Sequence, residues 1–212
     1  MKTLIIALSF IISTNVFSQN ITNTLGTNGV FTIKDASTNF LTLSQSTGQV
    51  NILRSLRLEN TTSSTLGVLF KGANSFLHNY GTDNTFLGVY SGNFTMTGFS
   101  NTAVGYGSLT LNTTGVQNTA FGYLSLYSNT TGYDNTALGM NTLRLNTTGY
   151  HNTSVGKSSL FSNTTGYQNT AVGLNSLLLN TSGFENTAVG HNSLVSNTTG
   201  ESNTAVGWSA LY

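Results

Sequence analysis

Residues 101–117 read NTAVGYGSLTLNTTGVQ, and residues 118–134 repeat the same pattern as NTAFGYLSLYSNTTGYD. The pattern first appears at Asn84 and recurs with a 17-residue period until Tyr212. Seven complete copies and one partial copy therefore fill 129 of the 212 residues in the chain. A fixed period of this length is typical of a coiled, layered architecture in which each repeat packs on its neighbours.

Two glycine columns mark the corners of each repeat. With the first Asn numbered as position 1, position 5 is Gly in all eight copies and position 15 is Gly in all seven complete copies. Because glycine permits positive φ and close backbone approach, each column predicts a tight turn. We therefore expect two short strands and two turns in every coil. The glycines assigned to structural turns include Gly105, Gly122, Gly139, Gly156, Gly173 and Gly190.

Apolar columns predict the core and an oligomer. Position 4 is apolar in all eight copies, and position 9 is Leu in every copy except the first. Position 3 is small except in the first copy, which has Phe86 there and Gly92 at position 9, as a capping repeat would. A coil this short encloses little apolar volume, whereas ordering each residue costs about 1–2 kcal/mol of backbone entropy. We therefore predict a homotrimer in which positions 3 and 4 face the shared axis.

The polar columns favour strands over helices. Positions 10 and 11 alternate between successive copies, so two copies can also be read as one double-length unit, with the period of helical tetratricopeptide arrays. Asn, Thr and Gly interrupt every potential helix, which argues against that alternative. The NTTG or NTSG element at positions 12–15 places Asn at a turn, where stacked Asn side chains can bond from coil to coil. The element also matches the N-glycosylation sequon, but glycans about 4.8 Å apart would collide, which indicates a bacterial or phage-type origin or unmodified turns.

The composition argues against several classes of function. Charged residues make up 6% of the chain and the net charge is +1, so we expect no electrostatic binding of nucleic acid or anionic lipid. The three histidines, His78, His151 and His191, show no metal-binding spacing. Asp134 and Glu185 share position 17 but lie three coils apart, roughly 14 Å, too far for a paired-carboxylate glycosidase. We therefore predict no enzyme activity, no metal site and no cofactor.

The part of the chain that precedes Asn84 predicts an exported protein with a separate entry module. Residues 1–19 combine Lys2 with an apolar run from Leu4 to Ile12, which is typical of a signal peptide. We expect no transmembrane segment in the mature chain, because no other apolar run approaches about 20 residues. Residues 20–83 alternate strand-like runs with Gly, Ser, Thr and Asn, and they predict a short β-rich N-terminal cap before the repeats at 84–212. The expected location is outside the cell or at its surface, with the bacterial outer surface favoured.

The repeated NTAVG, NTALG and NTSVG segments resemble the short Ala-hydrophobic-Gly motifs in the head domains of trimeric autotransporter adhesins. The longer pattern, NTAVG followed by a Ser-Leu step and NTTG, also resembles repeat proteins of environmental bacteria and phage-like tail fibres. The resemblance covers residues 84–212 and implies a parallel left-handed β-roll built from three chains. Residues and resemblance together predict an all-β chain, a β-roll or β-solenoid of 17-residue coils that forms a homotrimer.

Position 16 supplies the candidate ligand-binding residues. Its aromatic row includes Tyr133, Tyr150, Tyr167 and Phe184. An exported array with repeated Asn, Thr and aromatic side chains predicts a structural or adhesive protein that binds glycans or matrix through many weak contacts. Packing between coils is an alternative role for this aromatic row. The alternative functions are ice binding through Thr rows at positions 2, 13 and 14, and an inert spacer in a longer fibre.

Overall fold

The computed structural model describes residues 30–34, 39–44, 49–52, 61–64 and 67–212. The predicted signal peptide at residues 1–19 lies outside the described residues. The chain divides into two compact units, Met1–Arg57 and Leu58–Tyr212. The described residues form strands and turns, and they include no helix of the length and apolarity that a membrane span requires.

The first unit contains a small antiparallel sheet. Its strands are β1 (Val30–Lys34), β2 (Asn39–Ser44) and β3 (Gln49–Ile52), in the order β1-β2-β3. Thr32 pairs with Thr42, and Thr42 pairs on its other side with Asn51. The register shifts between Ile33 and Lys34, which marks a bulge near the end of β1. These strands lie within the region from which the N-terminal cap was predicted.

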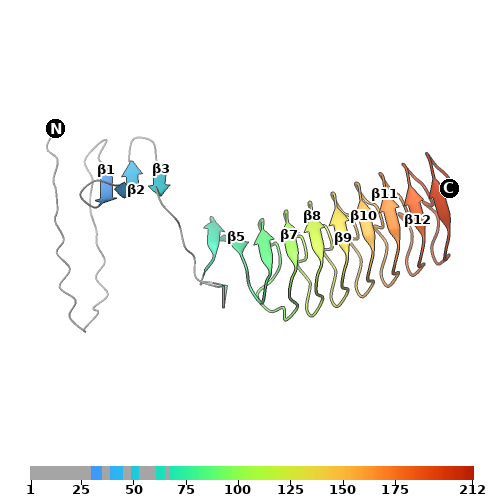
Figure 1. Ribbon diagram of the computed structural model, residues 1–212, viewed down its shortest axis with the longest axis horizontal. Helices are drawn as coiled ribbons and strands as arrows, with labels where there is room; N and C mark the ends of the chain where they lie inside the picture. The colour runs from blue at the N-terminus through green and yellow to red at the C-terminus, as the bar shows by residue number, and fades with distance from the viewer. Residues whose placement is uncertain (1–29, 35–38, 45–48, 53–60, 65–66) are drawn as a thin grey trace. The chain divides into compact units, whose positions relative to one another are not determined.

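The second unit is a parallel β-solenoid (Figure 1). It begins with β4 (Leu69–Lys71) and β5 (Asn74–His78), an antiparallel pair, and β5 then pairs antiparallel with β6. From β6 onward each strand pairs in parallel with the next, in a register shifted by one repeat along the chain. These strands are β6 (Thr85–Leu87), β7 (Thr102–Val104), β8 (Thr119–Phe121), β9 (Thr136–Leu138), β10 (Thr153–Val155), β11 (Thr170–Val172), β12 (Thr187–Val189) and β13 (Thr204–Val206). The predicted all-β solenoid with 17-residue coils is confirmed.

Each coil contains one strand, so the prediction of two strands is wrong. The single strand covers positions 2–4. The opposite side, positions 6–11, cannot form a strand because positions 7 and 9 have positive φ, as at Leu124 (52°) and Leu126 (49°). Its backbone still bonds to neighbouring coils, since the Leu126 N–H donates to the Thr142 carbonyl at 3.0 Å. Turns therefore replace the second strand while the hydrogen-bond ladder between coils continues.

Positions 3 and 9 line the interior of the coil. Ala120 and Leu126 are fully buried, which confirms position 9 as core, whereas Phe121 at position 4 is 50% exposed. Side chains alternate along a strand, so an inward residue at position 3 turns positions 2 and 4 outward. The prediction that position 4 belongs to the core of the coil is therefore wrong. The prediction that position 3 faces a partner chain is also wrong, because its side chains are buried within their own coil.

The first coil exchanges the sizes of the two inward residues. Phe86 stands at position 3 and is fully buried, and Gly92 stands at position 9. A Cβ added to Gly92 would lie 2.6 Å from a ring carbon of Phe86, which is a clash. The Phe86 ring therefore fills the space that Leu side chains occupy in later coils, so the interior volume is conserved. This exchange explains why the first copy departs from the repeat at both positions together.

Position 12 forms the predicted Asn ladder inside the coils. Asn146 donates from Nδ2 to the Asn129 Oδ1 at 2.8 Å, and its own Oδ1 accepts from the Asn163 Nδ2 at 2.8 Å. The same Nδ2 donates to the Gly149 carbonyl at 3.0 Å, which ties the side chain to its own turn. The fully buried members of the ladder are Asn112, Asn129, Asn146, Asn163 and Asn180. A glycan on these sequons would have to displace the ladder.

Position 1 forms a second buried Asn ladder. Asn152 donates from Nδ2 to the Asn135 Oδ1 at 3.0 Å and to the Gly166 carbonyl at 2.9 Å. Its Oδ1 accepts from both the backbone N–H and the Nδ2 of Asn169, each at 3.1 Å. The amide thus uses two donors and two acceptor sites, its full hydrogen-bonding capacity. Complete pairing offsets the cost of burying a polar side chain in every coil.

The two glycine columns are required for different structural reasons. At position 5 the backbone has positive φ, and a Cβ on Gly156 would lie 2.6 Å from the Gly173 carbonyl oxygen. At position 15 a Cβ on Gly132 would overlap the Asn129 amide oxygen and the Gly149 carbonyl oxygen. Position 5 therefore needs glycine for both its dihedral angle and its close contact, and position 15 needs it for close contact. The position 5 residues with φ of 119–136° are Gly105, Gly122, Gly139, Gly156, Gly173 and Gly190.

His78 is buried where β5 meets the first coil. Its ring centroid lies 4.8 Å from that of Phe86 and 4.4 Å from that of Phe94. Nδ1 accepts from the Tyr80 N–H at 3.4 Å, so Nε2 carries the proton and donates to the Ser91 carbonyl at 2.8 Å. Burial lowers the pKa of His78 below its ordinary value of 6.5, and the bond to Ser91 opposes part of that shift. The ring is therefore neutral around neutral pH.

Candidate functional site

The candidate ligand-binding residues at position 16 form one continuous column of rings. Ring centroids lie 4.8 Å apart for Tyr133 and Tyr150, and the interplanar angle is 2°. The next pair, Tyr150 and Tyr167, is separated by 4.9 Å at 5°. Tyr167 and Phe184 follow at 4.8 Å and 6°. The 17-residue offset between coils thus brings four residues from four different turns into direct contact.

The column offers ring edges and hydroxyl groups to a ligand. Tyr150 and Tyr167 have a stacked neighbour on both faces, so a sugar ring cannot stack on either. Tyr133 is 37% exposed, and the two following tyrosines are half-buried. No described residue hydrogen-bonds to the three phenol oxygens, and none of these oxygens is buried. The hydroxyls therefore reach solvent as a straight row, spaced about 4.8 Å apart.

A polar row at position 17 borders the aromatic column. Asp134 and His151 both have a φ of 53°, a left-handed conformation that non-glycine residues seldom adopt. The His151 Nε2 lies 3.4 Å from a carboxylate oxygen of Asp134. The His151 ring meets Tyr133 and Tyr150 edge-on, at centroid distances of 5.3 and 5.2 Å. These contacts hold an imidazole beside the tyrosine rings and a carboxylate beside the imidazole.

Acidic residues lie beside the other end of the column. Glu185 accepts a hydrogen bond from the Ser202 Oγ at 3.2 Å. Desolvation within the stack is the first cause that raises the pKa of Tyr167 above its ordinary value of 10.0. The negative charges of Tyr150, when ionised, and of Glu185 and Glu201 raise it further. The Tyr167 hydroxyl is therefore protonated around neutral pH and can both donate and accept a hydrogen bond.

Two exposed apolar rows flank the glycine corner at position 5. Position 4 contributes Phe121 and Leu138, which are 50% and 39% exposed, and position 6 contributes Tyr106 and Tyr123. The rings of Tyr106 and Tyr123 stack at 5.4 Å with an interplanar angle of 13°. The other exposed apolar residues in the two rows are Met140, Leu174, Val189, Val206 and Trp208. Position 4 is apolar in every coil, whereas Lys157 and His191 interrupt the position 6 row. Together the two rows form an apolar band, a feature typical of an interaction site.

The band is a feature that the sequence analysis missed. The repeat pattern had placed position 4 in the core of the coil, and position 6 had been given no role. The small residue at position 3 is the signal that could have found it, because an inward Ala makes position 4 an outward residue. Position 6 then follows on the other side of the glycine corner.

The Thr rows differ in how their hydroxyls are used. At position 13 the Thr130 Oγ1 donates to the Thr147 carbonyl of the next coil at 3.0 Å, so this row supports the backbone ladder. At position 2 the hydroxyls of Thr119 and Thr136 have no partner among the described residues and project outward from the strands. Position 2 therefore provides a regular row of free hydroxyl groups beside the apolar row at position 4.

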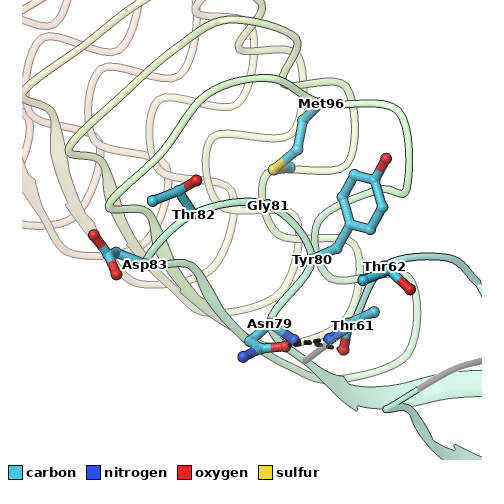
Figure 2. A pocket seen from close by; sticks show the side chains of 8 residues that line it. All are labelled: Thr61, Thr62, Asn79, Tyr80, Gly81, Thr82, Asp83 and Met96. Atoms are coloured by element: carbon cyan, nitrogen blue, oxygen red, sulfur yellow. Dashed lines mark hydrogen bonds between the residues drawn. The ribbon is translucent and has the colours of Figure 1, made fainter. Parts of the chain in front are cut away.

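An open hollow of about 610 Å³ lies at the start of the solenoid (Figure 2). Asn79 closes one side of it by accepting a bond from the Thr61 N–H at 2.9 Å. Its wall carries one carboxylate, from Asp83, and one aromatic ring, from Tyr80. The labelled side chains in Figure 2 do not converge on a single point. Within the described ranges, moreover, no three His, Asp or Glu side chains come together in a way that could hold a metal ion.

No protein-family model, no curated protein and no solved structure matches this chain. Inferences about its function therefore rest on the rows that the coils present and on the chemistry of their side chains.

Proposed function

We propose that this chain is a secreted or cell-surface repeat protein, structural or adhesive in role, that binds glycans or matrix polymers multivalently. One observation carries the proposal: each outward position recurs in every coil, about 4.8 Å from its equivalent in the next. A linear polymer lying along the axis can therefore meet the same chemistry many times. Weak single contacts then add up, because every contact after the first is intramolecular. The resemblance of the repeats to adhesin head domains supports the same role.

The proposed contact surface is the position 16 column with its neighbouring position 17 row. Phenol hydroxyls and a carboxylate can exchange hydrogen bonds with sugar hydroxyls. The low charge of the chain, 6% charged residues, fits a neutral polymer better than a polyanion. The ligand would lie across the ring edges of Tyr133, Tyr150 and Tyr167, since their faces are occupied by one another.

Glycan-array binding by the full chain tests this surface. We expect binding to be lost when Tyr133, Tyr150 and Tyr167 are replaced together by Ala, and weakened when the three are replaced by Phe. The Phe variant keeps the stack and removes only the hydroxyl groups, so it separates ligand contact from packing. Tyr127→Ala at position 10 is the matched control. Failure to bind any surface polymer, or unchanged binding by the triple Ala variant, would refute the proposed contact surface.

The homotrimer is proposed with positions 4 and 6, rather than positions 3 and 4, at the interfaces. Eight coils at about 4.8 Å per step span about 34 Å, so the band runs along the whole length of the repeat region. Exposed apolar side chains along this length are typical of a surface that a partner chain covers. Light scattering of the full chain tests this assembly. A trimeric mass that falls to the monomer value in Phe121→Ser combined with Leu138→Ser supports it, and a monomeric wild-type chain contradicts it.

The export signal and the N-terminal cap belong to the same proposal. Residues 1–19 would be removed on export, and residues 20–83 would protect the first edge of the stack. Pairing of β5 with β6 supports the protective role, because that edge of the parallel sheet is then occupied. The N-terminal sequence of the mature protein tests the cleavage, and a first residue other than one close to Gln19 would contradict it.

Ice binding is a second candidate that one observation favours. The free hydroxyls at position 2 and the apolar row at position 4 share the outward side of the strand positions, with a regular repeat along the axis. Thermal hysteresis at micromolar protein, lost on replacing Thr119 and Thr136 with Lys, would support this function. Ice crystals that grow unshaped in the presence of the protein would exclude it.

A further inference from the structure

Tyrosine rings stack between neighbouring coils at two places on the solenoid. At position 16, Tyr133, Tyr150 and Tyr167 form successive stacked pairs at 4.8 and 4.9 Å. At position 6, Tyr106 and Tyr123 stack at 5.4 Å. The strand ladder fixes the coil spacing, so it also holds these phenol rings in lasting contact. This arrangement bears on the oxidation chemistry of tyrosine.

Parallel stacking brings the reactive orbitals of two tyrosyl radicals face to face. The unpaired spin of such a radical occupies π orbitals on the oxygen and on ring carbons, including those ortho to the oxygen. These orbitals point perpendicular to the ring. In the pair Tyr133–Tyr150 they point toward one another, because the interplanar angle is 2°. The pair Tyr90–Tyr106, at 85°, lacks this alignment although its rings are also close.

The stacked phenols are accessible to an oxidant in solution. Their hydroxyls have no partner among the described residues and none of these oxygens is buried. The chain contains no cysteine whose thiol could reduce a tyrosyl radical. Radicals formed in the column therefore have neighbouring tyrosines as their nearest phenol partners.

We propose that the position 16 column is an oxidative modification site at which Tyr150 joins Tyr133 or Tyr167 as an intrachain dityrosine. The oxidant is a peroxidase acting with hydrogen peroxide. Each of two phenols loses one electron and one proton, and the radicals form a carbon–carbon bond between their ortho carbons. The hydrogen on each joined carbon then moves to the phenol oxygen as the rings regain aromaticity. Overall, two phenols and one hydrogen peroxide give one dityrosine and two water molecules.

The cross-link would connect coils that are otherwise held together by hydrogen bonds and packing. It joins equivalent residues of consecutive repeats, so it keeps adjacent coils together when the ladder opens. The chain has no disulfide that could serve this purpose. The cross-link depends on ring geometry and on accessible hydroxyl groups, and it is independent of the proposed adhesive function.

Trypsin digestion provides a direct test because the chain has few cleavage sites. Cleavage after Arg144 and Lys157 places Tyr133, Tyr150 and Tyr167 on three peptides, covering residues 72–144, 145–157 and 158–212. After treatment of the full chain with a haem peroxidase and hydrogen peroxide, we expect peptide 145–157 joined to one of the other two. The mass should equal the sum of the two peptides minus two hydrogen atoms, and fragmentation should place the bond on these tyrosines.

Matched variants and isotope mixing decide the outcome. Tyr150→Phe keeps the stack but cannot form the radical, so we expect both cross-linked species to disappear. Tyr127→Phe, which alters a tyrosine outside the stacks, should leave their yield unchanged. In an equal mixture of labelled and unlabelled chains, an intrachain bond gives no mixed-isotope product. Absence of these species in oxidised wild-type chain, their persistence in Tyr150→Phe, or mixed-isotope products alone would overturn the proposal.

Discussion

Replacing Asn152 with Ala tests the energetic role of the position 1 ladder. The Asn152 amide takes part in four side-chain hydrogen bonds, two to Asn169 and one each to Asn135 and Gly166. Truncation leaves the Asn169 N–H without this partner in a buried site, whereas the Gly166 carbonyl keeps the bond from the Asn163 Nδ2. A made bond contributes about 0.5–1.5 kcal/mol, and an orphaned buried group costs about 1–3 kcal/mol. We therefore expect the free energy of unfolding to fall by about 3–6 kcal/mol.

Two further variants should lower the free energy of unfolding by smaller amounts. Asn146 at position 12 takes part in three side-chain bonds and pairs with no backbone N–H, so Asn146→Ala should cost about 2–4 kcal/mol. Thr164 at position 13 makes one bond, from Oγ1 to the Thr181 carbonyl at 3.0 Å, and is half-buried. Thr164→Val should therefore cost about 0.5–1 kcal/mol. The predicted order of destabilisation is Asn152, then Asn146, then Thr164.

Urea unfolding of the full chain, followed by circular dichroism at one protein concentration, measures the series. Asn152→Asp adds a test that keeps the size of the side chain. A carboxylate cannot donate to the Gly166 carbonyl or to the Asn135 Oδ1, so we expect it to be at least as destabilising as Ala at neutral pH. Wild-type stability of Asn152→Asp would refute the hydrogen-bond reasoning. Equal losses for Asn152→Ala and Thr164→Val would refute it as well.

Three other predictions use the same unfolding assay. Gly156→Ala should prevent folding or cost more than about 4 kcal/mol of unfolding free energy, because its Cβ would lie 2.6 Å from a carbonyl oxygen. The control Gly72→Ala places its Cβ in open space and should cost about 1–2 kcal/mol, because the residue has a positive φ. Leu126→Ala truncates a buried side chain and should lower the free energy of unfolding by about 2–5 kcal/mol. Leu145→Ala, at an exposed site, should lower it by about 0.5 kcal/mol or less. Similar losses for the two variants would contradict the assigned core. His78 has a lowered pKa in the folded chain, so the unfolded chain takes up its proton first. Its contribution to stability is therefore complete above pH 6.5 and is lost as pH falls from there through the folded-state pKa. The stability of His78→Phe should depend less on pH over this window. An unchanged pH dependence would contradict the assignment.

The features of the fold that could be predicted from sequence each depend on a single column of the repeat. The period indicated the layered architecture, the Leu column indicated half of the core, and the Asn of NTTG indicated one ladder. Position 4 was misassigned because apolar character alone does not tell which side of a strand faces inward. The inward residue was instead the small one, Ala120 in the third coil, since Leu126 from the opposite side fills the space.

The turn-rich side of the coil could not be predicted from residue types. Leu is disfavoured at positive φ, by about 1–2 kcal/mol, yet Leu124 and Leu126 adopt it with φ of 52° and 49°. Nothing in the local sequence signals this conformation, because it is imposed by closure of the coil and by bonds to neighbouring coils. The prediction of a second strand failed for this reason.

The sequence predicted which residues form the candidate site, but it did not predict how their rings are oriented. An offset of one repeat implies that Tyr133 and Tyr150 are neighbours, as they are. Whether their faces are free or stacked depends on side-chain torsion angles that the sequence does not specify. Stacking removes the faces as ligand platforms and leaves the hydroxyl row, which changes the chemistry expected of the surface.

The in-register ladders also bear on how the length of such a chain can change during evolution. Each coil meets the next through the same two Asn ladders, so gain or loss of one whole 17-residue unit keeps both ladders in register and changes only the alternation at positions 10 and 11. An insertion of a single residue, in contrast, puts both Asn ladders and both glycine columns out of phase between two coils. Duplication in whole units thus preserves the ladders between coils while it changes how many times each surface row is repeated. Repeat number is consequently a property that selection can adjust separately from the structure of the coil.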